Sequence, residues 1–250
     1  MTDFSGRVAL VTGAASGIGA AVARWLDAQG IGELVLIDCD GAGLAALELG
    51  APARRIAGDV ADPRLWDRLE SEIERLDHAV LNAGIVAAAP IAQTDPSDWR
   101  RAMAVNLDGA FLGLRMALRR MSTGGSIVLT SSAVAMKPFA GTGAYGVSKA
   151  ALIQLARIAA AEAAPQGIRI NAIAPGRVET PIWTKTPHFE ALLAEHGSRE
   201  AALAALRAET AASRDFTTPE VIAAQIGFLL SPASANILGT VLVSDAGFSL

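Results

Sequence analysis

The chain has 250 residues, of which 52% are hydrophobic and 18% charged, and its formal net charge is -4 at pH 7. This composition excludes a disordered protein and suits a sheet that is covered on both faces. The acidic balance gives no electrostatic signature of a nucleic-acid partner or of an anionic membrane surface. We see no secretory signal and no apolar run of about 18 residues, and Cys39 stands alone, so we expect a cytoplasmic protein.

Short apolar segments alternate with longer amphipathic ones along the whole chain. We predict strands at 8–11, 34–37, 55–57, 79–81, 126–129, 168–173 and 241–243. We predict helices at 18–28, 43–49, 63–76, from 98 past 116, at 145–163 and after 219. Repeated strand–helix alternation indicates right-handed crossovers. The predicted fold class is therefore α/β: a single doubly wound Rossmann-type domain over 1–250, with a parallel sheet of about seven strands and helices on both faces.

A glycine-rich turn joins the first predicted strand to the first helix. It reads TGAASGIG, with Gly13, Gly17 and Gly19 around Ser16 and Ile18. Glycines at such a turn let the backbone approach a pyrophosphate, whose charge is stabilised by the helix N-terminus. The alternative is a turn that is glycine-rich only for close packing.

Asp38 ends the second predicted strand, where a carboxylate can bind the ribose hydroxyls of an adenosine. Its alternative role is to cap the following loop. Neither Cys39, Asp40 nor Ser16 offers a positive charge for a 2′-phosphate, so we predict NAD rather than NADP as the cofactor.

Tyr145, the single tyrosine, precedes Lys149 by one helical turn. A lysine ammonium about 4 Å from the phenol would supply roughly the 4 kcal/mol that lowers its pKa by about three units. The alternative is an ordinary tyrosine at a helix start. Asn106 lies in an apolar helical segment, where an amide needs a buried partner and either serves the site or distorts the helix.

These motifs together resemble the short-chain dehydrogenase/reductase family. The resemblance rests on 12–19, Asn82-Ala83-Gly84, Asn106, Ser132, Tyr145 with Lys149, and the NAIAPG segment at 171–176, in register over nearly the whole chain. Leu81 departs from the family pattern, which usually has asparagine there. Enoyl-acyl-carrier reductases of this fold space the tyrosine and lysine more widely, and extended sugar epimerases have a different glycine pattern.

The resemblance implies a catalytic role for Asn106, Ser132, Tyr145 and Lys149. Ser132, rather than its neighbour Ser131, would hold the substrate oxygen, and Tyr145 would be the general acid or base. Lys149 would lower the tyrosine pKa and bind the nicotinamide ribose, and Asn106 would hold a water of a proton relay. Cofactor contacts are implied for Gly13, Ser16, Gly17, Ile18, Gly19, Asp38, Asp59, Val60, Asn82, Ala83, Gly84, Tyr145, Lys149, Pro175, Gly176, Val178 and Thr180.

The implied activity is NAD-dependent interconversion of a secondary alcohol and a ketone, and the alternative is an NAD-binding sensor without turnover. A helical substrate lid is expected at 182–218, because long segments with their own helices are often lids. Val86, Met136, Phe139 and Trp183 are candidates for an apolar substrate wall, although each could simply pack the lid. The three scattered histidines show no metal-ligand spacing. Relatives usually form tetramers, so we expect a homotetramer.

Overall fold

A computed structural model describes residues 4–122, 124–182, 184, 187–208 and 216–250. Within these residues seven strands form one parallel sheet in the order β3-β2-β1-β4-β5-β6-β7. The strands are Val8–Thr12 (β1), Glu33–Asp38 (β2), Ala53–Ala57 (β3), His78–Leu81 (β4), Ser126–Thr130 (β5), Arg169–Pro175 (β6) and Val241–Ser244 (β7). The predicted single Rossmann-type sheet is confirmed.

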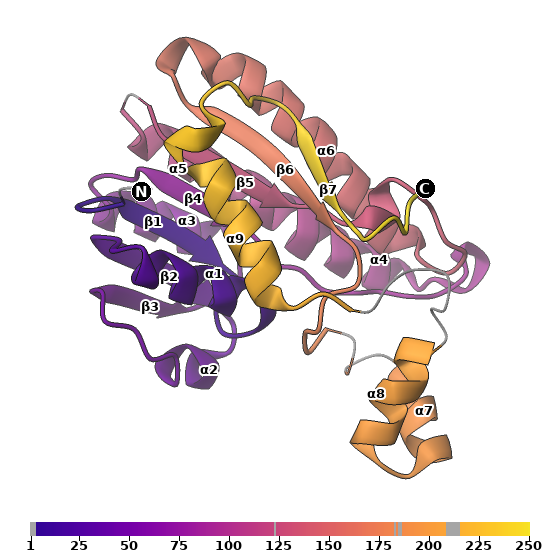
Figure 1. Ribbon diagram of the computed structural model, residues 1–250. Coiled ribbons are helices and arrows are strands. Elements are labelled where there is room, and N and C mark those ends of the chain that lie inside the picture. Colours follow the sequence, from indigo (N-terminus) through magenta and orange to yellow (C-terminus); the bar gives the residue numbers. More distant parts are fainter. Residues whose placement is uncertain (1–3, 123, 183, 185–186, 209–215) are drawn as a thin grey trace.

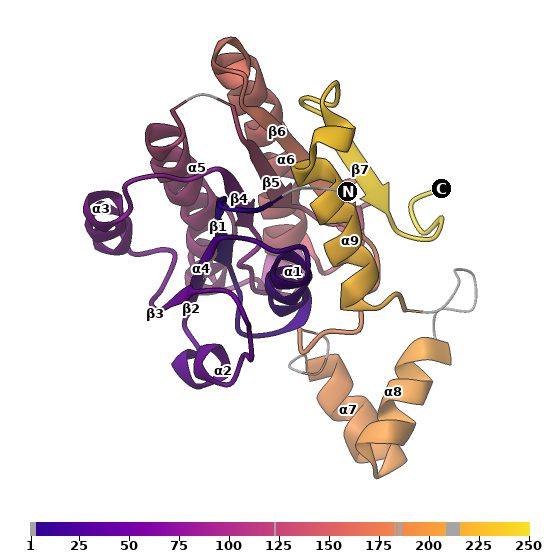
Figure 2. The ribbon, with the colours of Figure 1, turned by 60° about the vertical axis from the view of Figure 1, so that its left-hand side comes forward.

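Helices cover both faces of this sheet (Figures 1 and 2). They are Gly17–Ala28 (α1), Gly41–Ala45 (α2), Pro63–Glu72 (α3), Pro96–Met103 (α4), Gly109–Arg120 (α5), Gly143–Ala163 (α6), Pro187–His196 (α7), Arg199–Ala208 (α8) and Pro219–Leu230 (α9). The prediction that α3 runs to Leu76 is wrong, because the backbone becomes extended at Ile73, with φ -99° and ψ 111°. Ile73 and Leu76 are nevertheless buried, which explains why their spacing looked helical.

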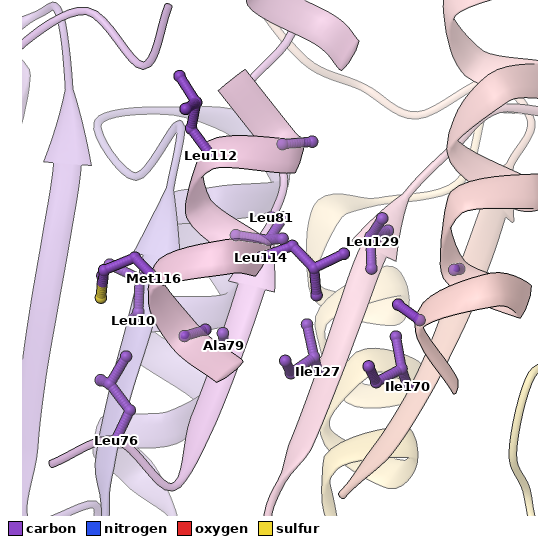
Figure 3. Packing of buried hydrophobic residues seen from close by; sticks show 14 of the residues in the cluster. Leu10, Leu76, Ala79, Leu81, Leu112, Leu114, Met116, Ile127, Leu129 and Ile170 are labelled. Carbon is purple, nitrogen blue, oxygen red and sulfur yellow. The ribbon is translucent and has the colours of Figure 1, made fainter. Parts of the chain in front are cut away.

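The strand residues alternate between two buried clusters, one on each face. Ile127 and Leu129 of β5 pack with α3, α5 and α6, as Figure 3 shows for the contacts around α5. Val128 between them faces the opposite cluster with α1 and α9. Because both faces are buried there, the inner strands β1 and β5 read as continuous apolar runs, whereas the edge strand β3 carries the exposed Arg54 and Arg55.

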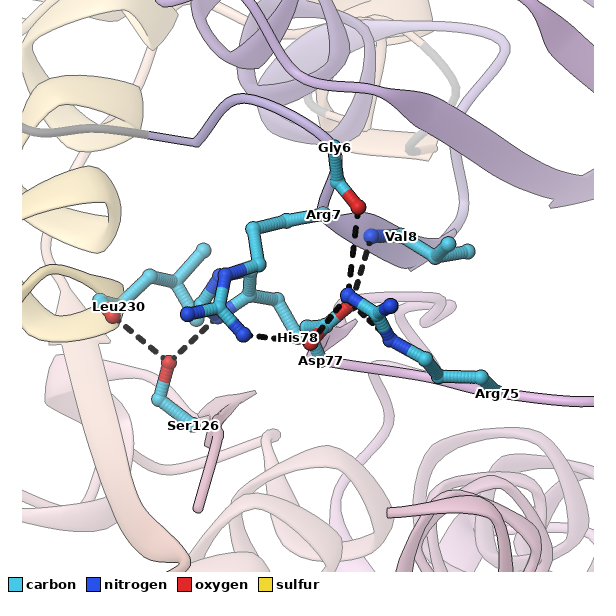
Figure 4. Close-up of polar contacts among 8 residues, drawn as sticks. All are labelled: Gly6, Arg7, Val8, Arg75, Asp77, His78, Ser126 and Leu230. Atoms are coloured by element: carbon cyan, nitrogen blue, oxygen red, sulfur yellow. Dashed lines mark hydrogen bonds and ion pairs between the residues drawn. The ribbon is translucent and has the colours of Figure 1, made fainter. Parts of the chain in front are cut away.

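A polar cluster fastens the amino-terminal edge of the sheet (Figure 4). The Asp77 carboxylate accepts hydrogen bonds from Arg7 Nη1 at 2.9 Å, Arg75 Nη2 at 2.8 Å and the Val8 amide at 2.9 Å. Ser126 Oγ donates to the Leu230 carbonyl oxygen at 2.8 Å and lies 2.8 Å from His78 Nδ1.

The single Ser126 proton goes to Leu230, so His78 Nδ1 must be the protonated nitrogen that donates to Ser126. Burial lowers the pKa of His78 to about 4, which makes this histidine neutral at pH 7. The cluster lies at the edge opposite the glycine turn, so it belongs to the framework and not to the candidate site.

The carboxyl-terminal edge has a point where the winding of the sheet reverses. From β1 the chain adds β2 and β3 on one side, and then crosses to β4 on the other side. The loops after β1 and β4 therefore flank a crevice, the place where open α/β sheets bind ligands. The glycine turn and Asn82–Gly84 are these two loops.

Candidate active site

The glycine turn is shaped by close backbone approaches that a side chain would block. Gly13 and Gly17 have φ of 67° and 53°, which glycine adopts without strain. A Cβ on Gly13 would lie 2.9 Å from the Ala83 Cα, and one on Gly17 would lie 3.0 Å from Thr180 Cγ2. Three loops, those after β1, β4 and β6, thus meet at this turn.

The start of α1 is suited to an anion. Ser16 is its N-cap residue, and in the part of the chain that the structure describes its side chain forms no capping hydrogen bond. The first turn carries no acidic residue. The N–H groups at a helix start and the positive end of the helix dipole stabilise phosphate. The glycine turn and this helix start together fit the pyrophosphate of a dinucleotide.

Asp38 holds the loops beside the glycine turn. Its Oδ2 accepts from the Ala15 amide at 2.9 Å, and its Oδ1 accepts from the Asp40 amide at 3.0 Å. Each carboxylate oxygen has lone pairs for a further donor, such as a ribose hydroxyl. The predicted loop-capping alternative therefore describes real contacts, but these contacts leave room for the ribose role.

The loop after β3 positions Asp59 and Val60 differently from each other. Asp59 is partly exposed and accepts from Arg101 Nη1 at 2.8 Å. Burial raises the pKa of its carboxyl group, but hydrogen bonds from the Ala61 amide and Arg101 outweigh this and lower it overall. The Val60 side chain is buried in the core, and its carbonyl accepts from Trp66 Nε1 at 2.8 Å. A ligand would therefore meet the backbone of Val60 rather than its side chain.

Asn82 joins the loop after β4 to the loop after β1. Its Nδ2 donates to the carbonyl oxygens of Thr12 at 3.2 Å and Gly13 at 3.4 Å. The Thr12 hydroxyl accepts from the amides of Asn82 and Ala83, at 2.9 and 3.1 Å. The crevice at the switch point is thus fixed by hydrogen bonds across it.

Tyr145 and Ser132 meet at the carboxyl-terminal edge. Their hydroxyl groups interact across the gap between the first turn of α6 and the end of β5, and this interaction lowers the pKa of the phenol. Ser131 points elsewhere, because its Oγ donates to the Lys149 carbonyl oxygen at 2.7 Å. The structure therefore places Ser132, and not Ser131, beside the phenol.

Lys149 is buried, with 3% of its surface exposed. Its Nζ donates to the Thr130 carbonyl oxygen at 2.8 Å and lies 5.8 Å from the centroid of the Tyr145 ring. Burial lowers the pKa of this ammonium to about 8. Nothing in the residue types predicted the Thr130 contact, because a backbone carbonyl leaves no signal in the sequence.

The expected lowering of the Tyr145 pKa by Lys149 is not what the structure shows. Burial raises the pKa of the phenol, and the hydrogen bond with Ser132 opposes that rise. The ammonium is directed toward Thr130 and is itself poorly solvated. The phenol is therefore held in its protonated form at pH 7, ready to donate a proton.

Asn106 lies in a π-helical segment, Ala104–Asp108, that separates α4 from α5. Its buried amide accepts from the Ile85 amide at 2.8 Å and donates to the Ile85 carbonyl at 3.0 Å and to Ser148 Oγ at 3.0 Å. Such π segments are frequent at functional sites. The side chain thus acts as a structural amide between three elements, and the predicted water relay remains a prediction.

Gly84 lets Lys149 and Asn106 approach the loop after β4. A Cβ on this glycine would lie 3.1 Å from Lys149 Nζ and 3.3 Å from Asn106 Oδ1. The segment after β6 completes the edge: Pro175 ends the strand, and the Gly176 amide donates to the Ser244 carbonyl at 2.9 Å.

Val178 and Thr180 continue this segment toward the glycine turn. Val178 is buried and pairs with Thr217 in an isolated parallel bridge. Thr180 lies against Gly17, the central glycine of the turn. The four predicted catalytic residues and the glycine turn are thus brought to one edge of the sheet.

The predicted apolar wall is only partly described. Val86, Met136 and Phe139 are 37%, 47% and 40% exposed, and Trp183 lies outside the described residues. Sequence reasoning missed Phe248, whose ring stacks on Phe139 with centroids 4.9 Å apart. An aromatic residue near the end of a chain is common, so its sequence position alone carried no signal.

The predicted lid segment contains α7 and α8, which pack against each other around Phe189, Leu192 and Ala202. Figures 1 and 2 show this pair standing away from the sheet, below its carboxyl-terminal edge. We find no helix in the described residues that is long and apolar enough to span a membrane. Nor do His, Cys, Asp and Glu residues gather in groups of three there, as metal ligands would.

Comparisons with known proteins agree with this architecture. A family model described as enoyl-(acyl carrier protein) reductase matches residues 13–249. Cis-4-hydroxycyclohexanecarboxylate dehydrogenase of Sinomonas cyclohexanicum is 37% identical over 98% of both chains. D-threitol dehydrogenase of Mycolicibacterium smegmatis is 36% identical over 99% of this chain and 95% of its own length.

Solved structures give the same fold. A short chain dehydrogenase/reductase family protein aligns with a TM-score of 0.82 at 30% identity, covering 99% of this chain and all of its own. A 3-ketoacyl-(acyl-carrier-protein) reductase from Brucella melitensis in complex with NADH aligns with a TM-score of 0.83 at 26% identity, over 99% and 100% of the chains. A Burkholderia cenocepacia dehydrogenase in complex with NADP aligns with a TM-score of 0.80 at 30% identity, covering 97% of this chain and 98% of its own.

Proposed function

Because this chain belongs to the short-chain dehydrogenase/reductase family, we propose that it is an NAD-dependent enzyme that interconverts a secondary alcohol and a ketone. Its dehydrogenase relatives support the assignment as an oxidoreductase. The two named relatives act on a ring alcohol and on D-threitol. We propose that the substrate is a small alcohol or ketone of that kind.

The observation that carries the proposal is the pairing of the Ser132 and Tyr145 hydroxyl groups beside the buried Lys149. In ketone reduction the Tyr145 phenol donates its proton to the carbonyl oxygen, and Ser132 holds that oxygen and stabilises its developing charge. In alcohol oxidation the same phenol must first lose its proton. Since its pKa is raised, oxidation is expected to accelerate with rising pH and reduction to prevail near neutrality.

NAD, when bound, accepts or supplies the hydride of the reaction. The residues that would hold it are the glycine turn and the start of α1 for the pyrophosphate, and Asp38 for the adenosine ribose. The loop after β3, Asn82–Gly84 and the segment from Pro175 to Thr180 would line the remaining cleft. Asp38 supports NAD over NADP because a 2′-phosphate would face its carboxylate without a cationic neighbour at Cys39 or Asp40.

The test combines NADH fluorescence with a panel of alcohols and ketones, on the wild type and on Tyr145→Phe. The variant should bind NADH as the wild type does and lose turnover by at least about a hundredfold, since only the acid–base hydroxyl is removed. NADH binding without turnover by the wild type across the whole panel would instead favour a sensor without catalysis. Turnover retained by Tyr145→Phe would refute the assigned chemistry.

We also propose a homotetramer in the cytoplasm. The supporting observation is exposed apolar surface on two long helices: Phe111 of α5 is 46% exposed and Ile158 of α6 is 49% exposed. Light scattering at micromolar concentration tests this, and a stable monomer would contradict it.

A further inference from the structure

The last residues of the chain form a compact turn that presents Phe248. The chain reverses at Ala246 and Gly247, with φ of 52° and 85°. The Asp245 carboxylate fixes the turn by accepting from the amides of Gly247 and Ser249, both at 2.9 Å. Burial raises the pKa of the Asp245 carboxyl group, but hydrogen bonds from the Ser249 side chain and from the backbone amides of the turn outweigh this and lower it, so the carboxylate is charged at pH 7.

This turn is clamped to two neighbouring loops. The Phe248 ring stacks on Phe139 at 4.9 Å between centroids and 25° between planes, and Arg177 Cζ lies 5.6 Å from the Phe248 centroid. Lys137 Nζ donates to the Phe248 and Leu250 carbonyl oxygens at 3.4 and 2.9 Å. Phe248 is therefore held between the loop after β5 and the loop after β6.

Both loops belong to the candidate site. The first connects Ser132 to Tyr145 in the first turn of α6, so the two predicted catalytic hydroxyl groups lie at its two ends. The Phe139 carbonyl accepts from the amide and the hydroxyl of Thr142, at 3.2 and 2.7 Å, and Thr142 is the N-cap residue of α6. The second loop begins at Gly176, directly before Arg177.

We propose that Phe248 and Phe139 together form a flat apolar wall of the substrate site, which selects cyclic secondary alcohols and ketones over short open-chain ones. The near-parallel stacking fixes the plane of Phe139, which remains 40% exposed. A flat exposed aromatic face buries more of a ring-shaped substrate than of a short chain. Phe248 acts through Phe139, so it is a positioning residue. The proposal rests on the proposed function.

The test compares Phe248→Ala and Phe139→Ala with Phe228→Ala, using cyclohexanol and 2-butanol as probes. Phe228 is a matched control, because it is 41% exposed and lies at the other end of the sheet, on α9. The first two variants should lose roughly tenfold or more in kcat/KM for cyclohexanol, mainly through KM, and little for 2-butanol. Phe248→Tyr should restore the wild-type ratio of the two probes, because it keeps the stacked ring.

Equal losses of kcat/KM for both alcohols, or no loss for either, would refute the proposed aromatic wall. If the wild type oxidises no alcohol at all, the proposed function fails, and ligand-observed NMR of cyclohexanone binding to the NAD-loaded protein decides the inference. A binding signal that is lost in Phe248→Ala and kept in Phe228→Ala upholds it. A signal that is unchanged in Phe248→Ala, or missing in the wild type, refutes it.

Discussion

Replacing Lys149 by methionine should stabilise the cofactor-free protein while abolishing activity. The ammonium is 3% exposed, and burial lowers its pKa from 10.5 to about 8. In the unfolded chain the same group keeps its ordinary pKa, so the unfolded state binds the proton more tightly. The charge therefore costs stability at pH 7, and this cost disappears as the pH rises above the unfolded pKa.

The magnitude follows from the shift. About 2.5 units at about 1.4 kcal/mol each give a cost of about 3 kcal/mol at pH 7. Losing the hydrogen bond to the Thr130 carbonyl offsets about 1 kcal/mol of the gain. Methionine matches the apolar stem of lysine in length, so little packing is lost. The net expectation is a variant more stable by about 2 kcal/mol.

Urea denaturation at equal protein concentration, repeated from pH 7 to about pH 9.5, measures this difference. The advantage of the variant should shrink by about 2 kcal/mol over that range, because the folded wild type gradually loses the costly proton. A variant that is less stable at pH 7 would refute the reasoning. So would an advantage that does not change with pH, since it would come from packing rather than from charge.

Three further predictions concern other groups. Ser132→Ala should reduce kcat far more than Ser131→Ala does. Ser131→Ala should instead lower the melting temperature, because it loses the hydrogen bond to the Lys149 carbonyl of α6. Equal losses of kcat would contradict the assignment of Ser132 as the serine that holds the substrate oxygen. The wild type should prefer NAD over NADP by about a hundredfold in kcat/KM, and Asp38→Ala should weaken NAD binding and reduce this preference. A wild type that uses both cofactors equally well would refute the role of Asp38 in binding the ribose. Acid should destabilise the protein through His78. Its folded pKa of about 4 lies below the unfolded value of 6.5, so stability is full above pH 6.5 and falls by about 2 kcal/mol between pH 7 and about pH 4.5. His78→Gln should flatten that part of the pH–stability curve. An unchanged slope would show that His78 does not cause the loss of stability in acid.

Most of the sheet could be predicted because each core strand is a short apolar run bounded by turn residues. Segments such as Ile127–Leu129 are buried on both faces, so their sequence needs no alternation to be recognised. The end of α3 could not be predicted in this way. Leu76 has helical spacing and is buried, but it reaches the core from an extended segment.

The meeting of Ser132 with Tyr145 was predictable, because a strand end and a helix start lie at the same edge of a parallel sheet. The direction in which the pKa of Tyr145 shifts could not be predicted. Helical spacing places Lys149 near the phenol but does not show that its ammonium turns to the Thr130 carbonyl. The π segment at Asn106 also lacks a residue-type signal, since it depends on how the amide is bonded in three dimensions.

The separate small core of α7 and α8 has an evolutionary consequence. Within the described residues, Phe189, Leu192 and Ala202 form a buried cluster of their own, separate from the clusters on the two faces of the sheet. A recombination event that exchanges the pair with that of a relative would leave the two large cores untouched. We expect such an exchange to alter the predicted substrate lid without requiring compensating mutations in the sheet and the helices that cover it.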